Sequence, residues 1–127
     1  MEKEHSILCV DDEAIVVTGL EKIFKKEGYA VHSARSAKEG LEILEKEKID
    51  LVMVDQKMPD MSGSQMLKIV NQKYPKVIRI LFSGYNDFNG LVDAVNKGEI
   101  FRFIQKPWDN EELKHTVRES LSHKVKS

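Results

Sequence analysis

Residues 6–13 read SILCVDDE, a short apolar segment that favours a β-strand and ends in two adjacent carboxylates. A segment with apolar residues at helical spacing follows, and the same alternation of short apolar and longer amphipathic segments continues along the chain. It predicts five strands, at Ser6 to Val10, Tyr29 to Ala34, Leu51 to Asp55, Val77 to Phe82 and Phe101 to Gln105. The pattern is typical of an α/β domain with a doubly wound parallel sheet, whose central strands are buried on both faces.

Five helices are expected, one after each strand, and each has a boundary signal. Polar side chains begin helices because they accept hydrogen bonds from free backbone N–H groups, whereas glycine and proline end them. The signals, in chain order, are Gly28 after the first helix, the capping box Ser36 to Glu39 before the second, Pro75 after the third, Asn86 or Asp87 before and Gly98 after the fourth, and Asp109 with Glu112 before the fifth.

Length and composition suit one globular domain of 127 residues. We expect a core from about residue 6 to 121, with the polar residues 122–127 as a frayed tail or the start of a linker. Twenty basic and 21 acidic residues give a net charge of -1, which does not favour direct nucleic-acid binding. The longest apolar runs have four residues, too few to cross a membrane, and the polar N-terminus lacks a secretory signal. The sequence therefore predicts a cytoplasmic protein without a membrane segment.

Three carboxylates stand where predicted strands end: Asp11 and Asp12 after the first strand, and Asp55 at the end of the third. In an open parallel sheet, ligands bind beyond the carboxyl ends of the strands, so we expect the three acids to converge. Carboxylates held together raise one another's pKa unless a cation offsets their charge. Mg²⁺ fits best, because it prefers oxygen ligands and no cluster of His or Cys favours zinc.

Two further polar groups follow the last two strands, Ser83 and Lys106. A hydroxyl, an ammonium group and Mg²⁺ around one carboxylate suit a phosphoryl group, because each can bind an oxygen as charge develops there. The sequence therefore predicts phosphoryl transfer to a carboxylate, which produces an aspartyl phosphate.

In their order and placement, these residues resemble the receiver domain of two-component response regulators over nearly the whole chain. The matching motifs are Val10-Asp11-Asp12-Glu13, Asp55 followed by Met58-Pro59 and Gly63, Ser83-Gly84, and Lys106-Pro107. The resemblance implies a single flavodoxin-like receiver domain with strand order 2-1-3-4-5. It also implies a signalling switch that catalyses only its own phosphorylation and dephosphorylation, and so is not an enzyme acting on other substrates.

The resemblance assigns the phosphoryl and metal sites residue by residue. Asp55 would accept the phosphoryl group from a phosphohistidine of a sensor histidine kinase or histidine phosphotransfer protein. Asp12 would ligate Mg²⁺ directly and Asp11 partly through water, while Asp55 and the backbone carbonyl of Lys57 would complete the protein ligands. Lys106 would pair with the phosphoryl group.

The resemblance also implies a conformational switch. Ser83 would move toward the phosphoryl group after transfer, and Phe101 occupies the switch-aromatic position, where the family more often has Tyr. The Lys106-Pro107 peptide bond would be cis. Lys57 and Tyr85 resemble positions that flank the path of attacking water, so we expect them to tune the lifetime of the phosphoryl group.

The implied readout surface consists of the fourth helix, the fifth strand and the fifth helix. It would control an output domain, in a longer parent chain, or a separate effector protein. Residues 83–108 resemble receivers that precede cyclic-dinucleotide phosphodiesterase domains or transcriptional activator modules. Homodimer formation on phosphorylation is a further outcome that the resemblance allows.

Other interpretations of the same residues stay open. A Mg²⁺-dependent phosphatase with an aspartyl nucleophile has a similar site, but needs an acid two residues after the nucleophile, where this chain has Lys57. A flavin or nucleotide binder would need a phosphate-binding loop in place of Asp11-Asp12-Glu13. Asp11 and Asp12 could simply cap a helix, and Phe101 could be a core residue. A degenerate receiver that only docks partners conflicts with the complete set of acids, hydroxyl and lysine.

Overall fold

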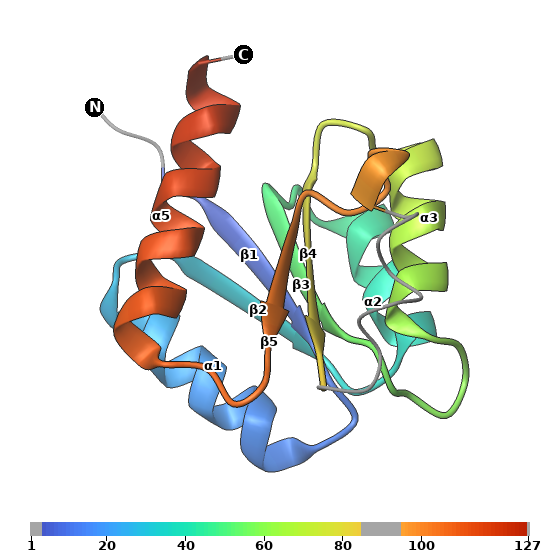
Figure 1. The fold of residues 1–127 in the computed structure, drawn as a ribbon, viewed down its shortest axis with the longest axis horizontal. Helices are drawn as coiled ribbons and strands as arrows, with labels where there is room; N and C mark the ends of the chain where they lie inside the picture. Colours follow the sequence, from blue (N-terminus) through green and yellow to red (C-terminus); the bar gives the residue numbers. More distant parts are fainter. Residues whose placement is uncertain (1–3, 85–94, 127) are drawn as a thin grey trace.

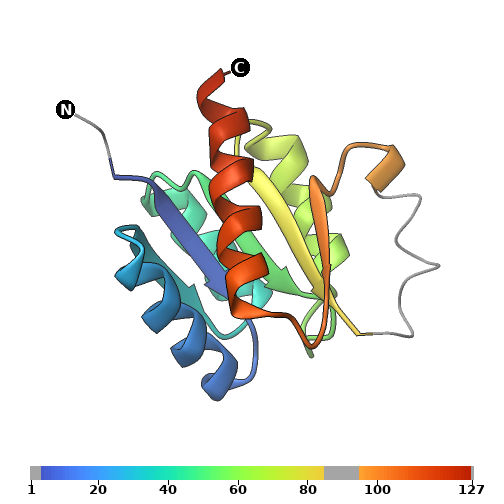
Figure 2. The ribbon, with the colours of Figure 1, turned by 60° about the vertical axis from the view of Figure 1, so that its left-hand side comes forward.

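The computed structural model describes residues 4–84 and 95–126, which form three layers (Figure 1). The elements in chain order are β1 (Ser6–Val10), α1 (Ala14–Lys26), β2 (Ala30–Ala34), α2 (Ala37–Lys46), β3 (Leu51–Asp55), α3 (Gly63–Lys73), β4 (Ile78–Ser83), β5 (Arg102–Gln105) and α5 (Asn110–Lys126). All neighbouring strands are parallel, in the order β2-β1-β3-β4-β5. Helices α1 and α5 cover one face of the sheet, and α2 and α3 cover the other (Figures 1 and 2). The predicted flavodoxin-like fold and strand order are confirmed.

Alternate residues of the strands enter two separate hydrophobic cores, one on each face. Ile7 and Cys9 of β1 pack in one core with residues of α1 and α5. Leu8 and Val10 pack in the other with residues of α2 and α3. Strands β1, β3 and β4 are almost wholly buried, which confirms the prediction for the three central strands.

The helix ends follow the sequence signals closely. Gly28 after α1 has a φ of 93°, a left-handed conformation that glycine adopts without strain. The Ser36 hydroxyl accepts a hydrogen bond from the N–H of Glu39 at 3.1 Å, as the capping box predicts. The reciprocal bond differs, because the Glu39 carboxylate accepts from the N–H of Arg35 at 2.7 Å, one residue before the cap. Two hydrogen bonds therefore hold Glu39 to the residues just before α2, one donated by its backbone and one accepted by its side chain.

Several strand boundaries differ from the prediction by one residue. β2 begins at Ala30, β4 runs from Ile78 to Ser83, and β5 begins at Arg102. Phe101 therefore lies just before β5 and not within it. Local composition places a strand boundary only to within a residue or two, and the N–H of Phe101 still donates to the Arg79 carbonyl on β4 at 2.8 Å.

Helix α5 continues to Lys126, so residues 122–126 are helical where we expected a frayed tail. This segment contains neither glycine nor proline, and polar composition alone does not end a helix. Four helices lie within the described residues; the expected fourth helix of the sequence falls mostly on residues 85–94, outside them, with residues 95 and 96 helical. None of the helices in residues 4–84 and 95–126 combines the length and apolar character that a membrane crossing requires.

Candidate functional site

The parallel register brings the predicted site residues to one edge of the sheet. Asp55 pairs with Phe82 across β3 and β4, and Ser83 pairs with Gln105 across β4 and β5. The N–H of Lys106 then donates to the Ser83 carbonyl at 2.9 Å. The acidic pair follows β1 directly, so residues almost a hundred positions apart meet because their strands end at the same level.

Asp11, Asp12 and Asp55 form one carboxylate cluster, with an oxygen of each lying within 4.8 Å of the others. Asp11 is fully buried and Asp55 is 6% exposed. One oxygen of Asp11, Oδ1, accepts a hydrogen bond from the N–H of Glu13 at 2.9 Å, but Oδ2 accepts none from the described residues. Burial raises the pKa of Asp11, against the lowering effect of that backbone hydrogen bond.

Lys106 reaches into this cluster from the end of β5. Its Nζ lies 2.6 Å from Asp55 Oδ1 and 3.7 Å from Asp11 Oδ2, so it binds Asp55 directly and contacts Asp11 only as a charge. Burial lowers the pKa of Lys106, but the hydrogen bond and negative charge of Asp55 outweigh it, and the pKa is raised overall. The ammonium group therefore stays charged at neutral pH.

A divalent cation fits this arrangement. Three carboxylates face one ammonium group, and a buried carboxylate oxygen is left without a hydrogen bond from the described residues. An unsatisfied buried oxygen is costly unless a further partner binds it, and clustered carboxylates are the ligands that hard cations such as Mg²⁺ prefer. The cluster is thus suited to Mg²⁺ on the chemistry of its donors.

Ser83 and Phe101 lie in contrasting environments. The Ser83 hydroxyl is buried and donates to the carbonyl of Gly84 at 3.3 Å. The Phe101 ring is exposed and lies edge-on to the ring of His123, with centroids 5.6 Å apart, and 5.2 Å from the guanidinium carbon of Arg102. Phe101 is therefore a surface residue in this structure, and the interpretation of it as a core residue is wrong.

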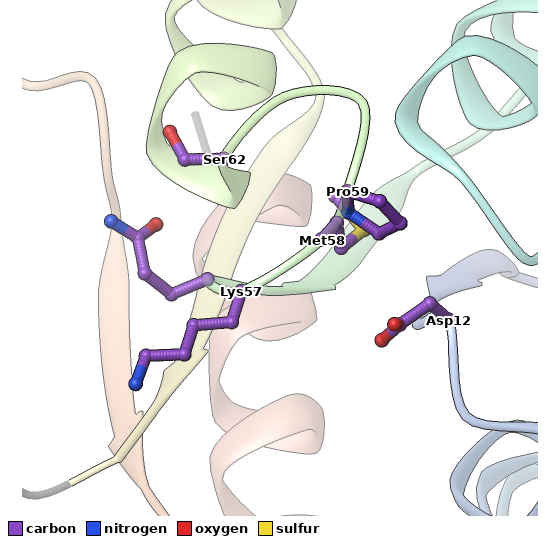
Figure 3. Close-up of a pocket in the computed structure, with 6 residues that line it drawn as sticks. Asp12, Lys57, Met58, Pro59 and Ser62 are labelled. Carbon is purple, nitrogen blue, oxygen red and sulfur yellow. The ribbon is translucent and has the colours of Figure 1, made fainter.

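The loop after β3 and Asp12 line an open pocket of about 540 Å³ (Figure 3). Its lining residues are Asp12, Gln56, Lys57, Met58, Pro59 and Ser62. The Lys57 side chain is exposed and extends away from Asp12 (Figure 3). The Lys106-Pro107 bond is cis, as predicted, whereas Tyr85 falls outside the described residues.

Sequence reasoning missed several residues that support the site from other segments. Both Nε and Nη2 of Arg35 donate to the carbonyl of Asp12, at 3.1 and 2.7 Å. The side chain of Gln56 binds Ser64 at the start of α3. Only the capping box that begins α3, Ser62 with Gln65, has a recognisable sequence signature. The other contacts join loops that are distant or irregular, so no local pattern marks them.

Comparison with known families gives a match over most of the chain. The family described as "Response regulator receiver domain" matches residues 7–118. The hydrogenase transcriptional regulatory protein HoxA of Cupriavidus necator is 32% identical over 120 residues, which cover 94% of this chain and 25% of that protein. The sporulation initiation phosphotransferase F of Bacillus subtilis is 31% identical over 117 residues, covering 92% of this chain and 94% of that protein.

The fold also resembles solved structures. The signal receiver domain of an HD domain-containing protein from Pseudomonas fluorescens Pf-5 superposes with a TM-score of 0.92 at 34% identity, covering 98% of this chain and all of that one. A CheY-like response regulator receiver domain protein from Methanospirillum hungatei gives a TM-score of 0.92 at 31% identity, with 98% of both chains covered. The chain thus spans about a quarter of the HoxA protein, but nearly the full length of the Bacillus subtilis phosphotransferase.

Proposed function

This chain belongs to the family of response regulator receiver domains, and from that premise we propose that Asp55 is the phosphoacceptor of a two-component phosphorelay. The donor would be a phosphohistidine of a sensor histidine kinase or histidine phosphotransfer protein in the cytoplasm. The observation that supports this most directly is the 2.6 Å contact between Lys106 Nζ and Asp55 Oδ1 within the carboxylate cluster. The carboxylate that would act as nucleophile lies there beside an ammonium group and two further carboxylates that could hold a metal ion.

Transfer would proceed by in-line attack of an Asp55 carboxylate oxygen on phosphorus. The new O–P bond forms as the N–P bond to the donor imidazole breaks, and the departing imidazole nitrogen takes up a proton. Lys106 would stabilise the charge on the transferring oxygens, since its ammonium group already binds the attacking carboxylate. The residues that would hold Mg²⁺ are Asp11, Asp12, Asp55 and the backbone carbonyl of Lys57. A bound Mg²⁺ would supply a second positive charge for the phosphoryl oxygens.

The output would come from a shift between two arrangements of Ser83 and Phe101. The new anionic oxygens would attract the Ser83 hydroxyl, and Phe101 would leave its exposed position for space near Ser83. This change would alter the surface formed by the fourth helix of the sequence, β5 and α5. An output domain or effector protein would bind that surface, as the greater length of the HoxA relative suggests. Homodimer formation after phosphorylation is compatible with the same surface.

Intact mass spectrometry after incubation with acetyl phosphate and Mg²⁺ tests the phosphoacceptor. We expect one added phosphoryl group on the wild type and none on Asp55→Asn, whose amide cannot form the acyl phosphate. Following the decay of the adduct also tests the proposal that Lys57 and Tyr85 restrict attacking water. Both Lys57→Ala and Tyr85→Ala should change the hydrolysis rate, and two unchanged rates would exclude that role.

The same preparation distinguishes a switch from an aspartyl phosphatase. Lys57 stands where a phosphatase needs an acid to protonate the leaving group, so we expect no steady release of phosphate from phosphomonoesters. Multiple turnovers that depend on Asp55 would show an enzyme and contradict a role as a switch alone.

A further inference from the structure

Gln56 joins three elements at the end of β3. Its side-chain oxygen accepts a hydrogen bond from the N–H of Ser64 at 2.8 Å, and its amide nitrogen donates to the Ser64 hydroxyl at 3.1 Å. Its backbone N–H donates to the carbonyl of Phe82 on β4, and its carbonyl accepts from the N–H of Gly63. Side chain and backbone together therefore tie the end of β3 to β4 and to the first turn of α3.

The first turn of α3 is itself held firmly against the backbone of Asp55. A Cβ atom at Gly63 would contact the Asp55 carbonyl oxygen and lie 2.7 Å from Leu81 Cδ1. The start of α3 therefore lies closer to β3 and β4 than a residue with a side chain would permit. The capping box adds two hydrogen bonds, from the N–H of Gln65 to the Ser62 hydroxyl and from the N–H of Ser62 to the Gln65 side chain. The loop of residues 57–61 thus connects two fixed ends.

We propose that Gln56 is a positioning residue for the metal site, which fixes the backbone of Lys57 through its bonds to Ser64. This inference rests on the proposed function, which assigns the Lys57 carbonyl to Mg²⁺. Lys57 follows Gln56 directly, and its exposed side chain extends away from Asp12 (Figure 3). The position of its carbonyl therefore depends on the backbone on either side of it.

The amide of Gln56 suits both partners on Ser64. Its carbonyl oxygen meets a backbone N–H in the first turn of α3, where such groups have no partner within the helix. Its NH₂ group meets the Ser64 hydroxyl oxygen. An apolar side chain of the same length would fill the space but leave both groups without these bonds. Outer hydrogen bonds that orient metal ligands typically change metal affinity by about 10–100-fold.

Magnesium titration of the whole chain, followed through the NMR amide signals of Asp12 and Lys106, tests this role without using phosphorylation. Gln56→Met keeps the side-chain length but removes both hydrogen bonds, and we expect its Kd for Mg²⁺ to rise about tenfold. Ser64→Ala removes only the hydroxyl and should give a smaller rise. Gln72→Met makes the same chemical change at an exposed position of α3 and should keep the wild-type Kd.

Circular dichroism and melting temperature separate positioning from general support of the fold. A Gln56→Met variant that is folded, melts lower and binds Mg²⁺ with the wild-type Kd would overturn the proposal. If that variant does not fold, Ser64→Ala decides: weaker binding in a folded chain supports the proposal, and unchanged binding overturns it. A wild type that neither binds Mg²⁺ nor accepts phosphate from acetyl phosphate would instead overturn the proposed function, and this role with it.

Discussion

Asp11 and Asp55, at the carboxyl edge of the sheet, are buried carboxylates, which are costly to the stability of a fold unless a partner offsets their charge. Asp11 is buried, and the loss of hydration raises its pKa although the N–H of Glu13 binds one oxygen. Lys106 offsets part of the negative charge by binding Asp55, but lies 3.7 Å from Asp11. Gly63 shows a different constraint, because the backbone of α3 leaves no room for a side chain beside Asp55. Charge and space therefore both restrict which side chains can lie within a few ångströms of Asp55.

Gly63→Ala should destabilise the protein even though alanine favours helices. The added methyl group would press on a backbone carbonyl, which cannot move as a flexible side chain can, so we expect a loss of about 1–3 kcal/mol of unfolding free energy. Gly19→Ala in α1 is the matched control, because nothing lies within 4 Å of a Cβ there. It should raise stability by about 0.5–1 kcal/mol, and urea unfolding measures both. Equal effects at the two sites would contradict this account.

A side chain in one loop can cap a helix that begins after a different loop. The clearest case is Asp60, in the loop between β3 and α3, whose carboxylate oxygens accept hydrogen bonds from Ala37 N and Lys38 N at 3.3 and 3.0 Å. These N–H groups belong to the first turn of α2, where a negative charge is also favourable. The loop that borders the pocket is thereby tied to a neighbouring helix. The Ser36 hydroxyl completes the cap by accepting a hydrogen bond from the N–H of Glu39, the third residue of α2.

Asp60→Asn should lower stability at neutral pH and lose its effect in acid. The hydrogen bonds from Lys38 and Ala37 hold the pKa of Asp60 below its ordinary value. A carboxyl whose pKa is lowered by folding stabilises the native state above its unfolded pKa, near 4, and loses that contribution as pH falls through the folded value. We expect a loss of about 0.5–1 kcal/mol at pH 7, modest because Asp60 is exposed.

Urea unfolding between pH 7 and pH 2.5 measures this difference. Glu42→Gln, at an exposed position of α2, removes the same charge without touching the helix N-terminus and should change stability little at any pH. If the difference in unfolding free energy between wild type and Asp60→Asn is the same at every pH, the charge of Asp60 does not contribute to the helix cap.

The sheet separates the two hydrophobic cores from the polar candidate site. The two cores lie on its faces, with helices α1 and α5 on one and α2 and α3 on the other (Figure 2). The polar site lies beyond the carboxyl ends of the strands, outside both cores. Buried strands therefore provide a rigid frame, while the loops at their ends hold groups that would be costly inside it. Binding of Mg²⁺ at this edge should stabilise the entire domain, because the carboxylates that would hold the ion lie at the ends of different strands.

Magnesium should accordingly raise the melting temperature of the wild type. At a concentration tenfold above Kd, a ligand that binds only the folded state adds about 1.4 kcal/mol of unfolding free energy. For a domain of this size we expect a rise of roughly 3–6 °C, measured by differential scanning calorimetry with NaCl at equal ionic strength as the control. Asp12→Ala should abolish the rise, since Asp12 supplies a carboxylate oxygen of the cluster and is only partly buried. The same rise in both proteins would contradict a metal site at this cluster.

Much of this architecture follows from the sequence alone. The strand and helix periods, the capping signals and the acids at strand ends are local patterns, and a parallel sheet has one edge at which such acids can meet. They determined the α/β fold and the grouping of Asp11, Asp12, Asp55 and Lys106. The mostly polar and basic composition of residues 122–126 suggested a frayed tail, although Val125 continues the four-residue spacing of Leu113, Val117 and Leu121 and no glycine or proline ends the helix, and α5 does continue through them.

Only the tertiary structure shows which side chains of the loops hydrogen-bond to other segments. Arg35 on the Asp12 carbonyl, Asp60 on α2 and Gln56 on Ser64 are side-chain contacts made to the backbone or side chains of other segments. Their existence depends on where two loops come to lie, to within about an ångström, because hydrogen bonds weaken steeply with distance and angle. The exposure of Phe101 has the same origin, since the packing around β5 sets it. Local sequence determines which elements form and what their ends carry, whereas long-range packing determines which of those ends touch.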